Sequence, residues 1–141
     1  MLGRGTRLAI LVSPKEACVN FLLLLHDRLS ITVILFWGAV GLWGLVSWIR
    51  GGSLSGSQAG ALAIGEALVI IQVLAGVALF LGGHRPPTST HYLYGATGIL
   101  AIPFAWSYYR VRDQRSALLV YSLISLFIFG LAIRGITTGS R

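Results

Sequence analysis

Charged residues are scarce in this chain, and acidic residues are the scarcest. Only 4 of the 141 residues are Asp or Glu, and charged residues together make up 11% of the sequence, against about 25% in a soluble domain. With 55% hydrophobic residues, the chain has too little polar surface to cover a globule in water. A soluble domain is therefore excluded, and lipid must surround most of the chain.

Cysteine and the motifs of catalytic sites are also lacking. Cys18 is the only cysteine, so the chain can form neither an internal disulfide nor a cysteine-based zinc site. There is no CxxCH motif for covalently attached haem, and no HExxH, GxSxG or phosphate-binding GxxxxGKS/T motif. No catalytic residue can be named, and the sequence does not favour an enzyme.

What the chain has instead is a net charge of +7 and long apolar segments. The basic residues lie in short loops and at segment ends, where lipid phosphates are found. This distribution indicates a lipid bilayer as partner and no nucleic acid.

Four segments are long enough to cross a bilayer, which needs about 20 apolar residues for about 30 Å of hydrocarbon. They are residues 29–49, 59–81, 90–109 and 117–133. Unpaired backbone groups are not tolerated in lipid, so each segment is predicted to be a helix. Short connections make neighbours antiparallel. We therefore predict an all-α, up-down-up-down bundle over residues 29–138, followed by a short tail, 139–141.

The residues before the first span carry a helix start. In "SPKE", Ser13 can cap the helix, Pro14 suits its first position and Glu16 completes a capping box. A helix from there to Ile49 would be about 54 Å long at 1.5 Å per residue, which exceeds the bilayer core. Residues 1–28 are therefore predicted to form an interfacial segment or an extension of the helix.

An even number of crossings places both termini on one side of the membrane, here called side A. Seven basic residues fall on side A and four on the opposite side B. Those on side A are Arg4, Arg7, Lys15, Arg28, Arg85, Arg134 and Arg141, and those on side B are Arg50, Arg110, Arg112 and Arg115. The excess predicts that side A is cytoplasmic, in a bacterial cytoplasmic membrane.

The stretch "GGHRPPTSTHYLYG" (residues 82–95) joins the second and third segments. Gly82 and Gly83 suit the end of a helix, the two prolines that follow stop it, and Thr88 or Ser89 can cap the next one. A tight helical hairpin is predicted.

Small residues recur at helical spacing and mark where helices should touch, because close backbone approach drives helix association in lipid. They include Gly38, Gly41 and Gly44 in the first span, Gly65 and Gly76 in the second, and Gly95, Gly98, Ala101 and Ala105 in the third.

All three histidines, His26, His84 and His91, fall on side A at a similar depth, close to Arg85 and Arg134. Imidazoles from two helices can supply both axial ligands of a b-type haem, with arginines facing its propionates. We predict His91 with either His26 or His84 as ligands of haem or another metal. Two alternatives stay open: these side chains meet lipid headgroups, or they handle quinone or protons.

The glycines that follow His91 bear on this site. His91, Gly95 and Gly98 share one helix face, which could leave a slot for a flat macrocycle or make room for a neighbouring helix.

Two polar residues lie within the second span. Glu66 should face the interior of the bundle. There it should either form an ion pair, with Arg50 or Arg110 as candidate partners, or be protonated. Its carboxyl group suits either a proton relay or a structural ion pair between helices. Gln72, on the glycine-lined face, suits an interhelical hydrogen bond.

The layout of residues 29–138, with histidines near helix ends and "HYLYG" opening the third helix, resembles haem A synthase halves and dihaem membrane cytochromes b. The resemblance implies haem b bound by histidines among His26, His84 and His91. The absence of a histidine on side B implies one haem at most. The ending "LAIRGITTG" is similar to small bacterial four-span membrane proteins of unknown activity.

These observations together predict a small integral subunit or accessory protein of a membrane electron-transfer assembly, with other membrane subunits or further copies of itself as partners. The alternatives are a cofactor-free packing subunit that binds partner helices and anionic lipid, and a small proton- or ion-conducting protein that uses Glu66.

Overall fold

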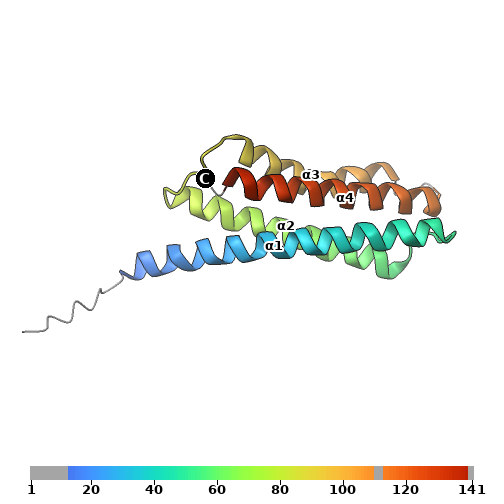
Figure 1. The fold of residues 1–141 in the computed structure, drawn as a ribbon, viewed down its shortest axis with the longest axis horizontal. Helices are drawn as coiled ribbons and strands as arrows, with labels where there is room; N and C mark the ends of the chain where they lie inside the picture. Colours follow the sequence, from blue (N-terminus) through green and yellow to red (C-terminus); the bar gives the residue numbers. More distant parts are fainter. Residues whose placement is uncertain (1–12, 110–112, 140–141) are drawn as a thin grey trace, which may run out of the picture.

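The structure is a computed structural model that describes residues 13–109 and 113–139. Within these residues all regular elements are α-helices, as predicted (Figure 1). The helices are α1 (Pro14–Ile49), α2 (Gly56–Leu81), α3 (Thr90–Tyr109) and α4 (Gln114–Gly139).

Helix α1 begins where the sequence predicts. Pro14 is its first residue, and the Ser13 backbone N–H donates to Glu16 Oε2 over 3.0 Å, which satisfies a donor that the first turn leaves free. The helix then continues unbroken for 36 residues, and its N-terminal end extends beyond the other three helices (Figure 1).

The predicted hairpin between α2 and α3 is also present. Gly82 ends α2, and Gly83 has a φ of +90°, a left-handed conformation that glycine adopts without steric cost. The His84 backbone N–H returns to the Leu79 carbonyl over 3.0 Å. The chain thereby leaves the helix at the position that the glycine pair indicated.

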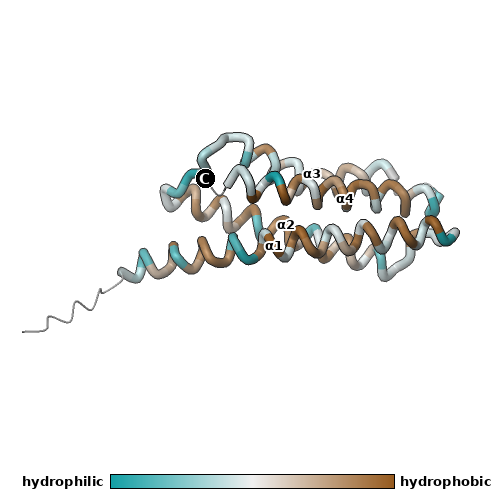
Figure 2. The backbone as a smooth tube through the Cα atoms, viewed as in Figure 1, coloured by the Kyte–Doolittle hydropathy of each residue, from teal (hydrophilic) through white to brown (hydrophobic). Residues whose placement is uncertain are grey.

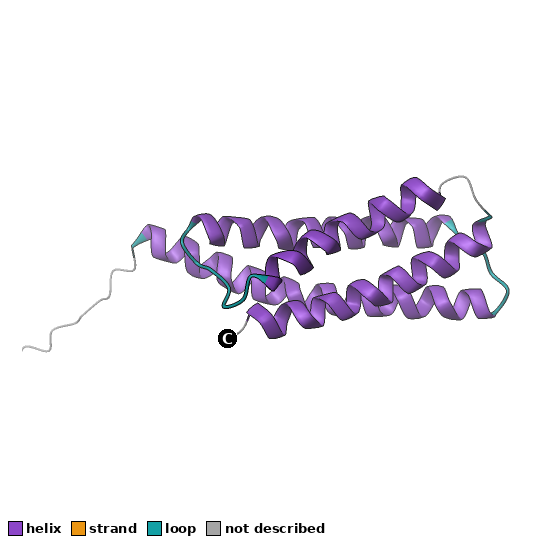
Figure 3. Cartoon of the chain, turned by 90° about the horizontal axis from the view of Figure 1, so that it is seen from above, coloured by secondary structure: helices purple, strands orange, loops and turns teal. Residues whose placement is uncertain are grey.

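The four helices form a ring in which each contacts two neighbours. α1 packs on α2 and α4, and α3 packs on the same two helices (Figures 1 and 3). Across the described residues, α1 and α3 make no backbone-level contact with each other, and nor do α2 and α4. The helices of these two pairs therefore face each other diagonally, so side chains must reach across the bundle axis to link them.

Small residues do mark the helix contacts. A Cβ atom built on Gly41 would lie 2.8 Å from Leu126 Cδ2, and one on Gly38 would lie 3.2 Å from Phe129 Cδ2. Both neighbours are on α4, so the glycine series of α1 lets the first and last helices approach each other. The fully buried Trp37 lies at the centre of the core.

The outer surface of the bundle is apolar along its length, and polar residues gather at its ends and in the loops (Figure 2). Leu35, Leu74 and Phe127 are more than half exposed on α1, α2 and α4, as is Phe104 on α3. Three helices, α1, α2 and α4, are long and apolar enough to cross a membrane. α3 has 20 residues but is not among these three.

Candidate functional site: a histidine pair

The structure brings together one histidine from each of two diagonal helices. His26 of α1 and His91 of α3 have ring centres 6.1 Å apart, with the ring planes inclined by 59°. Both side chains are partly buried. Because the backbones of α1 and α3 are not in contact, the two imidazoles meet across the bundle axis, at the end of the bundle where α2 ends and α3 begins.

His26 is held by reciprocal contacts with Gln72 on α2. The His26 Nδ1 atom lies 3.2 Å from the Gln72 carbonyl oxygen, and the Gln72 side-chain amide donates to the His26 carbonyl over 2.9 Å. Gln72 thus makes the interhelical link suggested by its place on the glycine-lined face.

His91 is held by α4. Its Nδ1 atom lies 3.1 Å from the carbonyl oxygen of Gly135. Nearby, Thr88 Oγ1 donates to the Thr138 carbonyl over 3.2 Å, which ties the hairpin to the end of α4. All four helices therefore contribute to this layer.

These contacts fix the tautomer of both rings. A backbone carbonyl can only accept a hydrogen bond, so in each neutral imidazole Nδ1 carries the proton and Nε2 presents its lone pair. Metal-binding histidines are commonly held in this way, with the second ring nitrogen donating to a carbonyl. Both rings thus present Nε2 as an acceptor, and for His26 the side-chain amide nitrogen of Gln72 lies 3.5 Å from this atom.

Glycines adjoin both rings. A Cβ atom on Gly76 would lie 3.2 Å from His26 Cε1, and one on Gly139 would lie 2.9 Å from His91 Cε1. Larger residues at these two positions would displace the imidazoles.

The other predicted cofactor residues lie outside the pair. His84 is exposed in the loop after α2, and the guanidinium of its neighbour Arg85 lies 5.2 Å from the centre of the Phe80 ring. Arg134 is exposed on α4, directly before the Gly135 carbonyl that accepts from His91. Of the three histidines, only His26 and His91 are neighbours.

The slot considered beside His91 is not open. A Cβ atom on Gly95 would lie 3.4 Å from Val73 Cγ2, and one on Gly98 would lie 3.3 Å from Val69 Cγ1. Valines of α2 lie in this space, which agrees with the alternative that the two glycines make room for a neighbouring helix. They allow α2 and α3 to approach.

Glu66 lies far from the pair, and both of its carboxyl oxygens are buried without a hydrogen-bond partner in the described part of the chain. The suggested pairing with Arg50 is therefore wrong, and Arg50 is exposed at the end of α1. The other suggested partner, Arg110, lies outside the described residues.

The donor set of the histidine pair suits a haem better than a bare metal ion. Zinc sites use three or four protein ligands, whereas no group of three His, Cys, Asp or Glu side chains that could hold a metal occurs within residues 13–109 and 113–139. A haem brings four nitrogens of its own and needs only two axial ligands.

Two features of this site had no signal that identified them in the sequence. The Gly135 carbonyl that holds His91 is a backbone group, and any residue could supply it. His26 meets His91 because of the rotation of α1 within the ring, whereas His84 lies in the loop beyond the end of α2. Comparisons of the chain with protein-family models, with curated proteins and with solved structures found no match.

Proposed function

We propose that this chain is a small integral membrane protein that binds one b-type haem through His26 and His91, as a subunit or accessory protein of a membrane electron-transfer assembly. The observation that carries the proposal is the pairing of two imidazoles across the bundle, each with Nδ1 bound to a backbone carbonyl. A bound haem would supply a centre that accepts and releases one electron.

The residues of the chain have separate roles in this proposal. The carbonyls of Gln72 and Gly135 orient the two rings and keep the proton on Nδ1, so that Nε2 carries the lone pair that would bind the iron. At His26 the side-chain amide of Gln72, 3.5 Å from Nε2, would have to turn away. Arg85 and Arg134 lie at the same end of the bundle and are suited to the propionates. The glycines beside the rings keep bulky side chains away from them.

Membrane insertion is part of the same proposal. Three helices have the length and hydropathy of membrane spans, and exposed Leu93, Leu100 and Phe104 give α3 an apolar outer face as well. Lipid would cover these faces, with α3 as the fourth span. The excess of basic residues on side A supports a cytoplasmic location for both termini in this proposal. Other membrane subunits or further copies of the chain are the expected partners.

The test is the absorption spectrum of the detergent-purified protein, expressed with ample haem. We expect a Soret band that shifts on reduction with dithionite. His26→Ala and His91→Ala should each remove it, whereas His84→Ala is the matched control and should keep it. A colourless wild-type protein would refute haem binding and favour the cofactor-free packing subunit. A band that survives His26→Ala but not His84→Ala would refute the assigned pair.

A second candidate function rests on Glu66. A carboxyl group whose two oxygens are buried and unpartnered within a membrane-type helix is costly to keep, and proton or ion conduction would account for it. Proton flux into liposomes that contain the protein should then be lost in Glu66→Gln and retained in Glu16→Gln, which changes an exposed acid at the start of α1. Equal flux in all three proteins would exclude this function.

A further inference from the structure

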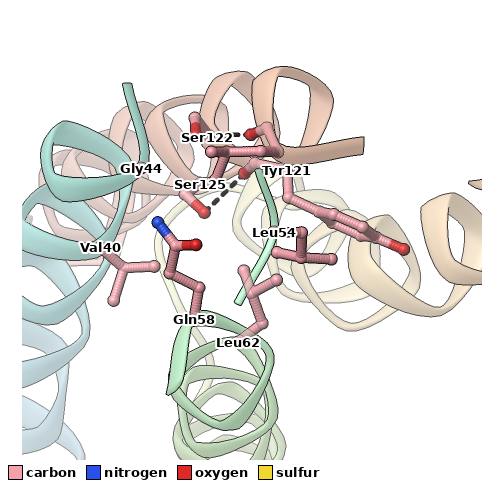
Figure 4. Close-up of a pocket in the computed structure, with 9 residues that line it drawn as sticks. Val40, Gly44, Leu54, Gln58, Leu62, Tyr121, Ser122 and Ser125 are labelled. Atoms are coloured by element: carbon pink, nitrogen blue, oxygen red, sulfur yellow. Dashed lines mark hydrogen bonds between the residues drawn. The ribbon is translucent and has the colours of Figure 1, made fainter. Parts of the chain in front are cut away.

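A small, mostly apolar cavity (Figure 4) lies near the start of α2 and of α4, at the other end of the bundle from the histidine pair. Its lining combines three buried polar side chains, Gln58 of α2 and Ser122 and Ser125 of α4, with apolar neighbours that include Val40 and Leu62. α2 and α4 are diagonal in the ring, so these polar groups approach one another across the bundle axis.

Gln58 is only 5% exposed and is fixed by the cap of α2. Its Oε1 atom accepts hydrogen bonds from the backbone N–H of Ser55 over 3.0 Å and from its hydroxyl over 3.1 Å. With the oxygen used in this way, the amide nitrogen is the polar atom of Gln58 that is left for a ligand, and Figure 4 shows it on the side of the cavity near Val40 and Gly44. That nitrogen makes no hydrogen bond to any residue that the structure describes.

The two serines face the cavity as acceptors. Ser122 Oγ donates to the Leu118 carbonyl over 2.6 Å, and Ser125 Oγ donates to the Tyr121 carbonyl over 2.7 Å. Each hydroxyl proton is thus used within α4, and lone pairs remain on both oxygens. An amide donor of Gln58 and acceptor oxygens of Ser122 and Ser125 therefore belong to residues that line the same cavity.

The size of the cavity selects the ligand. About 10 Å³ is open to the centre of a water molecule, which is about the smallest space that holds one water. We propose that Gln58, Ser122 and Ser125 bind a single buried water that links α2 to α4. The water accepts from the Gln58 amide and donates to the two serine hydroxyls, so that it has three partners, as buried waters commonly do. A cation is disfavoured because an amide N–H group points into the space.

The test is NMR of the full-length protein in lipid nanodiscs, with ¹⁵N in the glutamine side chains. The chain has three glutamines, Gln58, Gln72 and Gln114. Replacing each in turn assigns the side-chain amide signals to their residues. We expect a through-space cross peak between the Gln58 amide protons and a water that resides longer than bulk water. In Ser125→Val, which replaces an acceptor by a methyl group and fills the space, this cross peak should disappear while the Gln72 signals stay unchanged.

Two results would overturn the proposal. One is a Gln58 amide without a water cross peak in the wild-type protein, which shows a dry cavity and requires no variant. The other is a cross peak that persists unchanged in Ser125→Val, which shows access of bulk solvent. Ser107→Val, at an exposed serine of α3, is the matched control and should keep the cross peak. None of these readouts depends on haem binding.

Discussion

The indole ring of Trp37 occupies the space that a side chain at Gly65 would need. Trp37 Cζ2 lies 2.7 Å from the position of a Cβ atom on Gly65, and Trp37 is completely buried. This contact joins α1 to α2 in the middle of the bundle. Because the tryptophan is enclosed on all sides, it has no free space into which it could move.

We therefore expect Gly65→Ala to lower the free energy of unfolding by about 1–3 kcal/mol, as overpacked cores do. The matched control is Gly60→Ala in the same helix, where a Cβ atom would meet nothing within 4 Å. There the gain in helix propensity, up to about 1 kcal/mol, should leave stability unchanged or raised. Unfolding in mixed detergent micelles measures both, and equal effects at the two sites would contradict the contact.

Asp113 should make the stability of the bundle depend on pH. Its carboxylate accepts from the Ser116 backbone N–H and hydroxyl, each over 3.0 Å, and these hydrogen bonds, the backbone one foremost, lower the pKa of Asp113 below its ordinary value. A lowered folded-state pKa gives stability that is present above the unfolded pKa of about 3.9 and is lost as pH falls through the folded pKa.

The comparison with Asp113→Asn isolates this contribution, because asparagine keeps the acceptor oxygen but does not titrate. We expect the wild-type protein to be the more stable of the two at about pH 6 and the difference to shrink below about pH 4. Chemical denaturation across this range measures it. A difference that stays constant with pH would show that the carboxylate charge does not stabilise α4.

Gln72 should contribute modestly to stability through its hydrogen bond to the His26 carbonyl. Interhelical hydrogen bonds in membrane proteins average about 0.6 kcal/mol and reach about 1.7 kcal/mol. Gln72→Met, which keeps the shape but removes the donor, should lower the free energy of unfolding within that range. An unchanged stability would show that the α1–α2 contact is maintained by packing alone.

Glu66 should be a residue that lowers stability. Its buried oxygens lack partners, and leaving a polar group so buried costs about 1–3 kcal/mol in protein mutational data. Glu66→Leu should therefore raise the free energy of unfolding by about that amount, with Asp27→Leu, at an exposed acid of α1, as the control. A lower stability would show that the carboxyl group gains a partner in the membrane.

The sequence by itself determined the helices and several of their ends. Apolar length, the "SPKE" start at Ser13 and the glycine pair at Gly82 and Gly83 act within a few residues of the chain, so they can be recognised without knowledge of the fold. Antiparallel order then brings His26 and His91 to the same end of the bundle. Local chemistry and chain connectivity are therefore enough to predict the helices, their ends and the end of the bundle at which the histidines lie.

Only the tertiary structure decided which groups meet across the bundle. The spacing of Gly95 and Gly98 served a macrocycle and a neighbouring helix equally well, and in the structure valines of α2 lie beside both glycines. The pairing of His26 with His91, and the presence of Gln58 in one cavity with the serines of α4, depend on how far each helix is rotated about its own axis. That rotation is set by contacts between distant segments, such as Trp37 on Gly65, whose combined packing no local sequence pattern encodes.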